Sequence, residues 1–488
     1  MFLNNKLKVL MELHPCLFGF SGISQETRLL FAYFHNIPFI TTSGLLNFNL
    51  PDSPFLKILN LKHKQISQAS KLILAAVKEK NNKFAFSEMV SIGIRLYFAS
   101  TFNLLGITAA LGTFESAGFE DFLWDQLFSK SLSKEEFKAV TKSVYRTLGF
   151  SPHALRLLRK YNARHLKINT SEYDVLFVQT PFPGAVSSKT QLVVRYHDAV
   201  PLMLPHLIHD SMFHQASHYK ALCSNAKRGV FVCTSNDTRE DLLRVFPQLE
   251  KRSQVIHDMI AKDYFAESAD EQRLKQLIRN YSYEARRDLG SDERADDEFY
   301  AKSLADHLSY ILIVSTIEPR KNHIRLIRAW ERVRTRTKRA LKLVFVGDLG
   351  WQTAPIVAVM KPWQQQGELF HLQKVPFEHL RLLYRGAACV VCPSIKEGFD
   401  LSGIEAMACQ GLVAASAIPV HKEVYGAAAL YFDPYSFENQ AEVIELALTQ
   451  GPNFTDLLRE KGLIQAQKYQ PKAILPQWED FFARLKTT

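Results

Sequence analysis

The chain has 488 residues, of which 47% are hydrophobic and 22% are charged, as is ordinary for a soluble globular protein. This length exceeds what one hydrophobic core usually serves, so two domains are expected. The net charge of +11 favours anionic partners such as a nucleotide or a phospholipid surface. Nucleic acid is not an expected partner, because the cations are scattered and no zinc-finger or RNA-binding pattern accompanies them.

The first half of the chain alternates short apolar runs with helical patterns. The run "KLKVLMEL" at 6–13 is typical of a buried strand. Strands separated by helices indicate a parallel sheet that is covered on both faces. We predict a Rossmann-like, acceptor-side domain over 1–262, with further strands at 174–180, 191–198, 229–235 and 253–258.

One long apolar segment interrupts this alternation. Residues 89–114 belong to an apolar helical insert expected at about 50–165, and Arg95 is their only charge. The segment is long enough to span a bilayer, but Arg95, Asn103 and three glycines disfavour a span. A buried pair of helices is expected, and a helical insert at the membrane interface is the alternative.

A charged stretch separates the two halves of the chain. Residues 263–306 are rich in both signs of charge and poor in aliphatic side chains, which predicts a solvated linker with one helix at 271–280. The alternation of strands and helices then restarts over 307–468, which predicts a second Rossmann-like domain. An amphipathic helix in 469–488 is expected to pack back on the first domain. The strands of the second domain are expected at 310–316, 341–347, 389–394, 411–416 and 428–434.

The predicted fold class is therefore α/β, with two doubly wound domains that face a cleft. Ligands of such sheets bind outside the carboxyl ends of the strands. In "SIKEGFDLSGIEAMACQG", Glu397 occupies the loop after a predicted strand. Ser402 and Glu405 match a capping box, which is the structural alternative for Glu405. Gly398, Gly403 and the helix start behind them suit an anion, so a carboxylate here predicts a ligand with hydroxyls joined to phosphate, such as a sugar nucleotide.

Three segments carry a resemblance to a known family. The stretch from "PSIKEGFDLSGIEAMACQG" to "AALYFDP", together with "ILIVSTIEPRKNHIRLIRAW" and "YHDAVPL", resembles the retaining GT-B glycosyltransferases of family GT4, the group 1 glycosyltransferases. The resemblance covers the second domain closely and the first only in patches. It implies the GT-B fold, in which two Rossmann-like domains enclose a nucleotide-sugar site.

The resemblance also implies roles for individual residues. Glu397 matches the glutamate that holds hydroxyls of the transferred hexose, and Glu405 matches the one that bonds the nucleotide ribose. Arg320 and Lys321 match the cations that neutralise the diphosphate and stabilise the charge that grows on the leaving group. Their structural alternative is the start of a solvated helix.

His197 matches the family's histidine beside the donor sugar, against the alternative of a purely structural histidine, and Asp198 is expected to shape the turn or to orient His197. Two departures from the family are Asp400, where many relatives carry glycine, and "VIHDMI" at 255–260, where many have an asparagine-glycine turn. The remaining expected donor contacts are Gly398, Phe399, Asp400, Leu401, Gly22, Gly347, Asp348 and Val375.

No metal and no cofactor are expected, and the nucleotide diphosphate sugar is itself the donor substrate. His206, His209, His214 and His218 invite a metal site, but neither an HExxH motif nor a DxD pair accompanies them. The six cysteines are too sparse for a disulfide scaffold, and the first apolar run is too short for a signal peptide, so cytoplasm is the expected compartment.

The predicted activity is that of a metal-independent hexosyltransferase (EC 2.4 class) acting with retention on a glycan or lipid-linked acceptor. The "TIEPRKN" variant most resembles branches that use GDP-mannose in surface polysaccharide or lipopolysaccharide assembly. Peripheral contact with the inner face of the plasma membrane is a further expectation. The alternatives are a nucleotide-sugar hydrolase or epimerase of the same fold and a non-catalytic subunit of a glycosylation complex. A dinucleotide oxidoreductase is disfavoured, because no GxGxxG motif is present.

Overall fold

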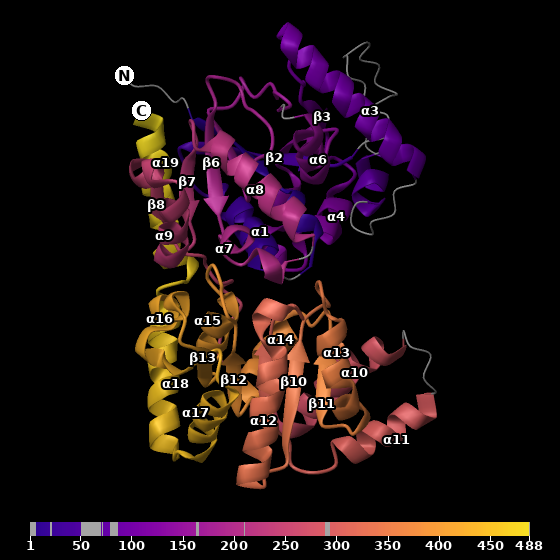
Figure 1. The fold of residues 1–488 in the computed structure, drawn as a ribbon, viewed down its shortest axis with the longest axis vertical. Helices are drawn as coiled ribbons and strands as arrows, with labels where there is room; N and C mark the ends of the chain where they lie inside the picture. Colours follow the sequence, from indigo (N-terminus) through magenta and orange to yellow (C-terminus); the bar gives the residue numbers. More distant parts are fainter. Residues whose placement is uncertain are drawn as a thin grey trace.

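The structure is a computed structural model, and it describes residues 6–19, 22–49, 70, 72–78, 86–162, 165–208, 210–287 and 293–487. Two α/β domains lie one above the other, the N-terminal domain in indigo to magenta and the C-terminal domain in orange to yellow (Figure 1). Each is built on its own sheet, which confirms the predicted GT-B class of two doubly wound domains.

The N-terminal sheet has eight strands in the order β3-β4-β2-β1-β5-β6-β7-β8. Its neighbours pair in parallel except for β3 and β4, which are antiparallel. The five predicted strands are present, whereas β2, β3 and β4 were not predicted. The strands are β1 (Leu7–Glu12), β2 (Ile40–Asn47), β3 (Gly112–Phe114), β4 (Val144–Leu148), β5 (Val175–Val178), β6 (Gln191–Tyr196), β7 (Val230–Cys233) and β8 (Ser253–Val255).

Helices cover both faces of this sheet, as a fully buried apolar strand such as β5 requires. The helices are α1 (Gly22–Phe34), α3 (Phe86–Phe102), α4 (Glu120–Leu123), α5 (Phe137–Thr141), α6 (Pro152–Asn162), α7 (Val200–Met203), α8 (Ser211–Asn225) and α9 (Asn236–Val245).

The segment 89–114 does not form the buried helix pair that we predicted. It contains most of the single helix α3, a short 3-10 turn and β3. Only one stripe of α3 is buried, through Ile92, Leu96 and Ala99, and the rest of its apolar surface is exposed. Within the described ranges, no helix combines the length and the apolar content needed to cross a bilayer.

The C-terminal sheet is entirely parallel, in the order β11-β10-β9-β12-β13-β14. All five predicted strands are present, and β11 was not predicted. The strands are β9 (Ser309–Val314), β10 (Leu341–Val346), β11 (Leu369–Leu372), β12 (Cys389–Cys392), β13 (Val413–Ser416) and β14 (Ala429–Phe432), and the helices between and after them are α12 (His323–Thr337), α13 (Ala354–Gln365), α14 (Phe377–Gly386), α15 (Leu401–Ala408), α16 (Pro419–Tyr425), α17 (Phe437–Thr449) and α18 (Pro452–Gln467).

The stretch 263–306 differs from the predicted solvated linker. It holds two helices, α10 (Glu271–Arg287) and α11 (Glu293–Ser303), and α10 packs against β11 and α14. Leu274, Leu277 and Ile278 of α10 are buried in the hydrophobic core. The charge density marks the outer face of a packed helix rather than a solvated connection.

The chain crosses between the domains twice, and the two crossings touch. After β8 it enters the C-terminal domain, and after α18 it returns in α19 (Pro471–Thr487), which lies beside β7 and β8 of the N-terminal domain (Figure 1). The amide of Ile260 donates a hydrogen bond to the carbonyl of Tyr469 at 3.0 Å, which joins the crossings. Trp478 of α19 packs against Phe34 and Phe177.

Candidate active site

A cavity of about 860 Å³ lies between the two domains. In a doubly wound fold the loops after the parallel strands meet here, which is where ligands bind. Every residue predicted to be catalytic or donor-binding lines this cavity. The lining residues among them are Gly22 and His197 from the N-terminal domain and Arg320, Lys321, Gly347, Asp348, Val375, Glu397, Gly398, Phe399, Asp400, Leu401 and Glu405 from the C-terminal domain.

Glu397, in the loop between β12 and α15, is held between two cations. Its Oε2 accepts from Nη1 of Arg320 at 2.6 Å, and its Oε1 lies 2.5 Å from Nζ of Lys321. Burial opposes ionisation of Glu397, but Arg320 and Lys321 outweigh it and keep the pKa of the carboxyl below its ordinary value. The site therefore presents a carboxylate and two cations side by side.

Arg320 and Lys321 do not start a solvated helix. They form the short 3-10 turn Pro319–Lys321 before α12, and Lys321 is buried. Burial disfavours the charged lysine, but Glu397 and then Asp400 reverse the effect and raise its pKa. The buried Lys321 and the partly buried Arg320, both facing the cavity, suit a polyanion such as a diphosphate.

Asp400 takes a backbone conformation that favours glycine, with φ of 68°. Ser402 Oγ donates to its Oδ1 at 2.7 Å, and His421 Nε2 lies 3.1 Å from its Oδ2. Burial opposes its ionisation, but Lys321 and His421 hold the pKa of Asp400 below its usual value. Asp400 is therefore a fixed carboxylate in the cavity wall.

Glu405 does not form the capping box with Ser402. Its Oε1 accepts from Nε2 of Gln25 at 2.9 Å, and its Oε2 accepts from the hydroxyl of Tyr384 at 3.0 Å. The bond to Gln25 crosses the cleft, because Gln25 lies in α1. Burial raises the pKa of Glu405 to about 7, against the opposing effect of these hydrogen bonds.

His197 directly follows β6 and lines the cavity, as predicted. Asp198 does not orient it; the carboxylate of Asp198 accepts from the amide of Val200 and shapes the turn. The partners of the imidazole are Gln179 and Glu26, which the sequence analysis did not single out. Gln179 could have been found, since it stands at the end of the strand predicted at 174–180.

Two glycines keep the cavity loops close to their neighbours. A Cβ on Gly398 would lie 1.8 Å from the carbonyl oxygen of His197, and one on Gly347 would lie 2.1 Å from that of Ser315. The buried Arg28 donates a hydrogen bond to the carbonyl of Gly19, ahead of α1. Arg28 is a further residue that the sequence analysis missed.

His206, His214 and His218 belong to no metal-ligand group among the residues that the structure describes. His218 Nε2 lies 3.2 Å from the hydroxyl of Tyr196, and position 209 falls outside the described residues. Among the residues that the structure describes, one group has metal-ligand composition: Glu26, His197 and Asp258. The guanidinium of Arg195 contacts both of its carboxylates, each at 2.5 Å, so a side-chain cation already occupies the place between them.

The two parallel-sheet domains and the cleft site define a protein of the GT-B class. Residues 295–462 match the family model described as "Glycosyl transferases group 1". The match supports the resemblance seen in the sequence. The matched stretch contains Arg320, Lys321, Glu397 and Glu405.

Two curated relatives are mannosyltransferases by description. The O-antigen chain mannosyltransferase B of Escherichia coli is 29% identical over 205 residues, 40% of this chain and 54% of the relative. The O-antigen chain mannosyltransferase RfbU of Salmonella typhimurium is 48% identical over 63 residues, 13% of this chain and 18% of the relative. The matches thus span about half or less of the relatives' own length.

A solved structure matches the whole chain. The sucrose-phosphate synthase from Thermosynechococcus elongatus superimposes with a TM-score of 0.57 at 14% identity, covering 99% of this chain and all of that one. Similarity at this level of identity extends to the fold alone.

Proposed function

We propose that the protein is a hexosyltransferase that moves a hexose, with retention, from a nucleotide diphosphate sugar to a hydroxyl of a glycan or lipid-linked acceptor. The observation that carries the proposal is the position of Glu397 between Arg320 and Lys321 in the interdomain cavity. A carboxylate there can accept hydrogen bonds from ring hydroxyls, while the adjacent cations take the diphosphate.

The chemistry follows from these charges. As the bond between the anomeric carbon and the diphosphate breaks, negative charge grows on the leaving oxygen, and the cations of Arg320 and Lys321 stabilise it. The acceptor hydroxyl attacks the same face of the sugar and gives its proton to that oxygen, which conserves the configuration. Enclosure between the two domains keeps water away from the donor.

For the donor we propose GDP-mannose, and for the pathway the assembly of a surface polysaccharide. Support comes from the two relatives described as O-antigen chain mannosyltransferases. The sequence features behind this choice are the "TIEPRKN" segment and the glutamate pair, both within the family match.

A thermal-shift panel tests the donor class. A ligand that binds only the folded protein raises its melting temperature, by an amount that grows with concentration over Kd. GDP-mannose is expected to raise it more than UDP-glucose, and GDP more than UDP. If no nucleotide or nucleotide sugar shifts the melting temperature, the proposal is contradicted.

Turnover measurements separate the alternative functions. Turnover that rises with added acceptor separates a transferase from a hydrolase or epimerase, and no turnover with a bound donor indicates a non-catalytic subunit.

Metal independence is part of the proposal, because the side-chain cations supply the positive charge that a bound metal gives elsewhere. Transfer is expected to be unchanged after dialysis against EDTA. Loss of activity that Mg²⁺ or Mn²⁺ restores would contradict it.

We also propose that the protein contacts the inner face of the plasma membrane from the cytoplasm. The support is the exposed apolar surface of α3 and the turn after it, at the edge of the N-terminal domain (Figure 1). Its members include Phe86, Ile94, Phe98, Leu104 and Leu105. The unchanged protein is expected to co-sediment with anionic liposomes, and the double variant Ile94→Asp, Phe98→Asp is expected not to. If the unchanged protein does not co-sediment, the proposal of membrane contact is wrong.

A further inference from the structure

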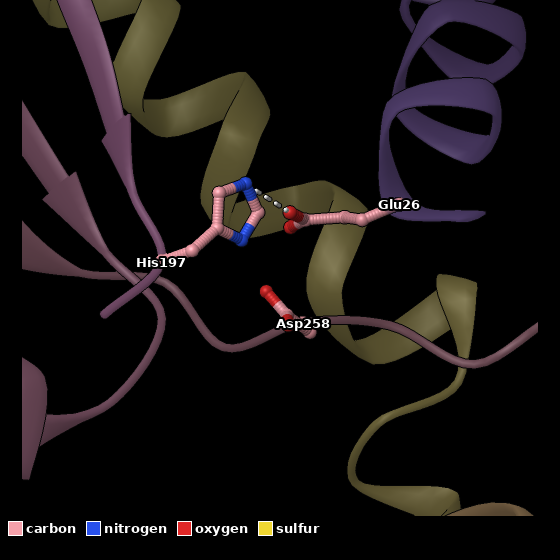
Figure 2. Close-up of side chains that lie close together, drawn as sticks. All are labelled: Glu26, His197 and Asp258. Atoms are coloured by element: carbon pink, nitrogen blue, oxygen red, sulfur yellow. Dashed lines mark ion pairs between the residues drawn. The ribbon is translucent and has the colours of Figure 1, made fainter. Parts of the chain in front are cut away.

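A buried cluster of charged side chains lies directly behind His197. Glu26 from α1, Arg195 from β6 and Asp258 from the segment after β8 meet there, and Figure 2 shows Glu26, Asp258 and His197 converging from these separate elements. Glu26 and Arg195 have no exposed surface, and Asp258 is 4% exposed. We call Arg195, Glu26 and Asp258 the Arg195 cluster.

Arg195 is fixed from several directions. Its Nη2 lies 2.5 Å from Oε1 of Glu26 and 2.5 Å from Oδ1 of Asp258, and its Nη1 donates to the carbonyl of Ile256 at 2.6 Å. Its guanidinium also lies over the ring of Trp478, 5.3 Å from the centroid. These partners fix the side-chain conformation of the buried Arg195. Because Nε and Nη2 of Arg195 both donate to the carboxylate of Glu26, the side chain of Glu26 is fixed as well.

The two carboxyl groups of the Arg195 cluster have pKa values shifted in opposite directions. Burial raises the pKa of Asp258 well above its ordinary value, and the nearby charge of Glu26 adds to the effect. Burial also opposes ionisation of Glu26, but Arg195 and then His197 outweigh it and lower its pKa. Glu26 is thus the ionised carboxylate of the pair, and it is the one that contacts His197.

The imidazole of His197 meets oxygen acceptors at one nitrogen. Its Nε2 lies 3.0 Å from Oε1 of Gln179 and 3.5 Å from Oε2 of Glu26. An amide oxygen and a carboxylate both require a donor, so Nε2 carries the hydrogen. Burial lowers the pKa of His197 to about 4, so the ring is neutral at pH 7. Its Nδ1 lies on the side of Asp258 (Figure 2), makes no hydrogen bond to a residue in the described ranges, and is therefore the acceptor of the ring, while His197 and Asp258 both line the cavity.

We propose that Glu26, held by Arg195, is a positioning residue that fixes His197 as the Nε2–H tautomer and leaves Nδ1 to accept a hydrogen bond from a hydroxyl of the carbohydrate in the cavity. A hydroxyl can donate to a bare Nδ1, whereas a ring with hydrogen on Nδ1 can only donate to the hydroxyl oxygen, so the tautomer sets the direction of this hydrogen bond. This inference rests on the proposed function for the identity of its substrate. The assignment of the His197 tautomer does not depend on the proposed function.

The first test measures the tautomer directly. Protein labelled with ¹⁵N in its histidines is examined by two-bond proton–nitrogen correlation at pH 7, and the His197 signals are assigned by their loss in His197→Gln. The expected pattern is a neutral ring with hydrogen on Nε2. A ring protonated on Nδ1, or an imidazolium, would overturn the proposal. The experiment needs no substrate, so its outcome is independent of whether a sugar is transferred.

The second test is a double-mutant cycle between Glu26→Gln and His197→Gln. In Glu26→Gln the new amide can donate to Nε2 and favour the wrong tautomer, so kcat is expected to fall on the order of ten- to a hundredfold with little change in donor KM. The same change in the His197→Gln background is expected to cost nothing more. An equal fold loss in both backgrounds would mark a structural role and overturn the proposal.

The tests also separate this inference from the proposed function. If Glu26→Gln fails to fold, the tautomer of the unchanged protein still decides. If the unchanged protein transfers no sugar from any nucleotide sugar, the proposed function fails, while the nitrogen spectra report on Glu26 and His197 as before.

Discussion

At the scale of single residues, the site is a set of buried charges that need one another. Glu397 has 6% exposure, and Arg320 and Lys321 each contact one of its oxygens. Removing one partner of a buried charged pair leaves the other uncompensated, so these residues tolerate little change. The same three side chains serve the proposed chemistry, which ties local stability to catalysis.

Glu397→Gln is expected to lower turnover by on the order of a hundredfold or more, because a contact made in the transition state is worth several kcal/mol. Binding of the nucleoside diphosphate, measured by calorimetry, is expected to persist, since Arg320 and Lys321 remain. The matched control is Glu479→Gln, on an exposed position of α19. Activity of Glu397→Gln within a few-fold of the control would show that Glu397 has no such role.

Glu405 makes the stability of the protein depend on pH. Its pKa is raised by burial from 4.5 to about 7, so between these values the folded protein keeps a proton that the unfolded chain releases. The stabilising effect is complete below pH 4.5 and is lost as pH rises toward 7. Melting temperatures from pH 5 to pH 8 are expected to fall less in Glu405→Gln than in the unchanged protein. Glu479→Gln is expected to keep the original slope, and an unchanged slope in Glu405→Gln would contradict the assignment.

The family resemblance predicted the residues that line the cavity. It did not predict Glu26 and Arg195, which lie behind His197. Glu397, Arg320 and Lys321 lie in loops after strands, where a charged side chain has no packing role to explain it. Glu26 lies in α1, a helix that was not predicted, and Arg195 lies inside a predicted strand, where charge is ordinarily exposed. Their meeting depends on the contact of α1 with β6 and the segment after β8, which local patterns do not encode.

At the scale of elements, α19 links the end of the chain to the N-terminal site. Trp478 has no exposed surface, packs on Phe34 and Phe177, and lies over the guanidinium of Arg195. Trp478→Ala is expected to destabilise the N-terminal domain by about 3–5 kcal/mol, because a large buried ring leaves a cavity. Urea unfolding measures the loss.

The adjacent Gln477→Ala is the control for this change, because Gln477 is exposed and bonds only to its own helix through the carbonyl of Ala473. Its effect is expected to stay within about 0.5 kcal/mol. Similar midpoints for the two variants would mean that α19 does not support the domain.

Helices and strands could be predicted from the sequence where the pattern of apolar residues matched one type of secondary structure. The strands β9, β10 and β12 consist mostly of buried apolar residues, and the structure has them where they were expected. β2 was missed because "ITTSGLLN" mixes polar residues and glycine into a buried strand, and Gly44 is required there by the rings of Tyr145 and the side chain of Leu13. The α10 segment was read as a linker because its charges outnumber the three buried apolar side chains that anchor it.

At the scale of the whole molecule, the two domains are in contact around the cavity. Gln25 bonds to Glu405 across the cleft, and Trp351 Nε1 donates to the carbonyl of Leu207 on the N-terminal side. Glu423 of α16 accepts from the backbone amide of Asn236 at the start of α9, at 2.8 Å. Together with the hydrogen-bonded crossings at Ile260 and Tyr469, these contacts describe a closed state.

Gly398 makes a close contact between the domains and is a suitable place to test closure. Its carbonyl accepts from Ser235 Oγ at 2.7 Å, and a Cβ would lie 1.8 Å from the backbone oxygen of His197. Backbone cannot yield as a flexible side chain does, so Gly398→Ala forces the domains apart. Because a displacement of about 1 Å at reacting groups costs on the order of a hundredfold in rate, turnover is expected to fall by that factor while each domain stays folded.

X-ray scattering measures the separation of the domains. With bound nucleoside diphosphate, Gly398→Ala is expected to give a larger radius of gyration than the unchanged protein. Gly451→Ala is the matched control, because a Cβ there meets nothing within 4 Å. If Gly398→Ala scatters and turns over like Gly451→Ala, the contact at Gly398 does not control closure, and the transfer proceeds in a more open arrangement of the two domains.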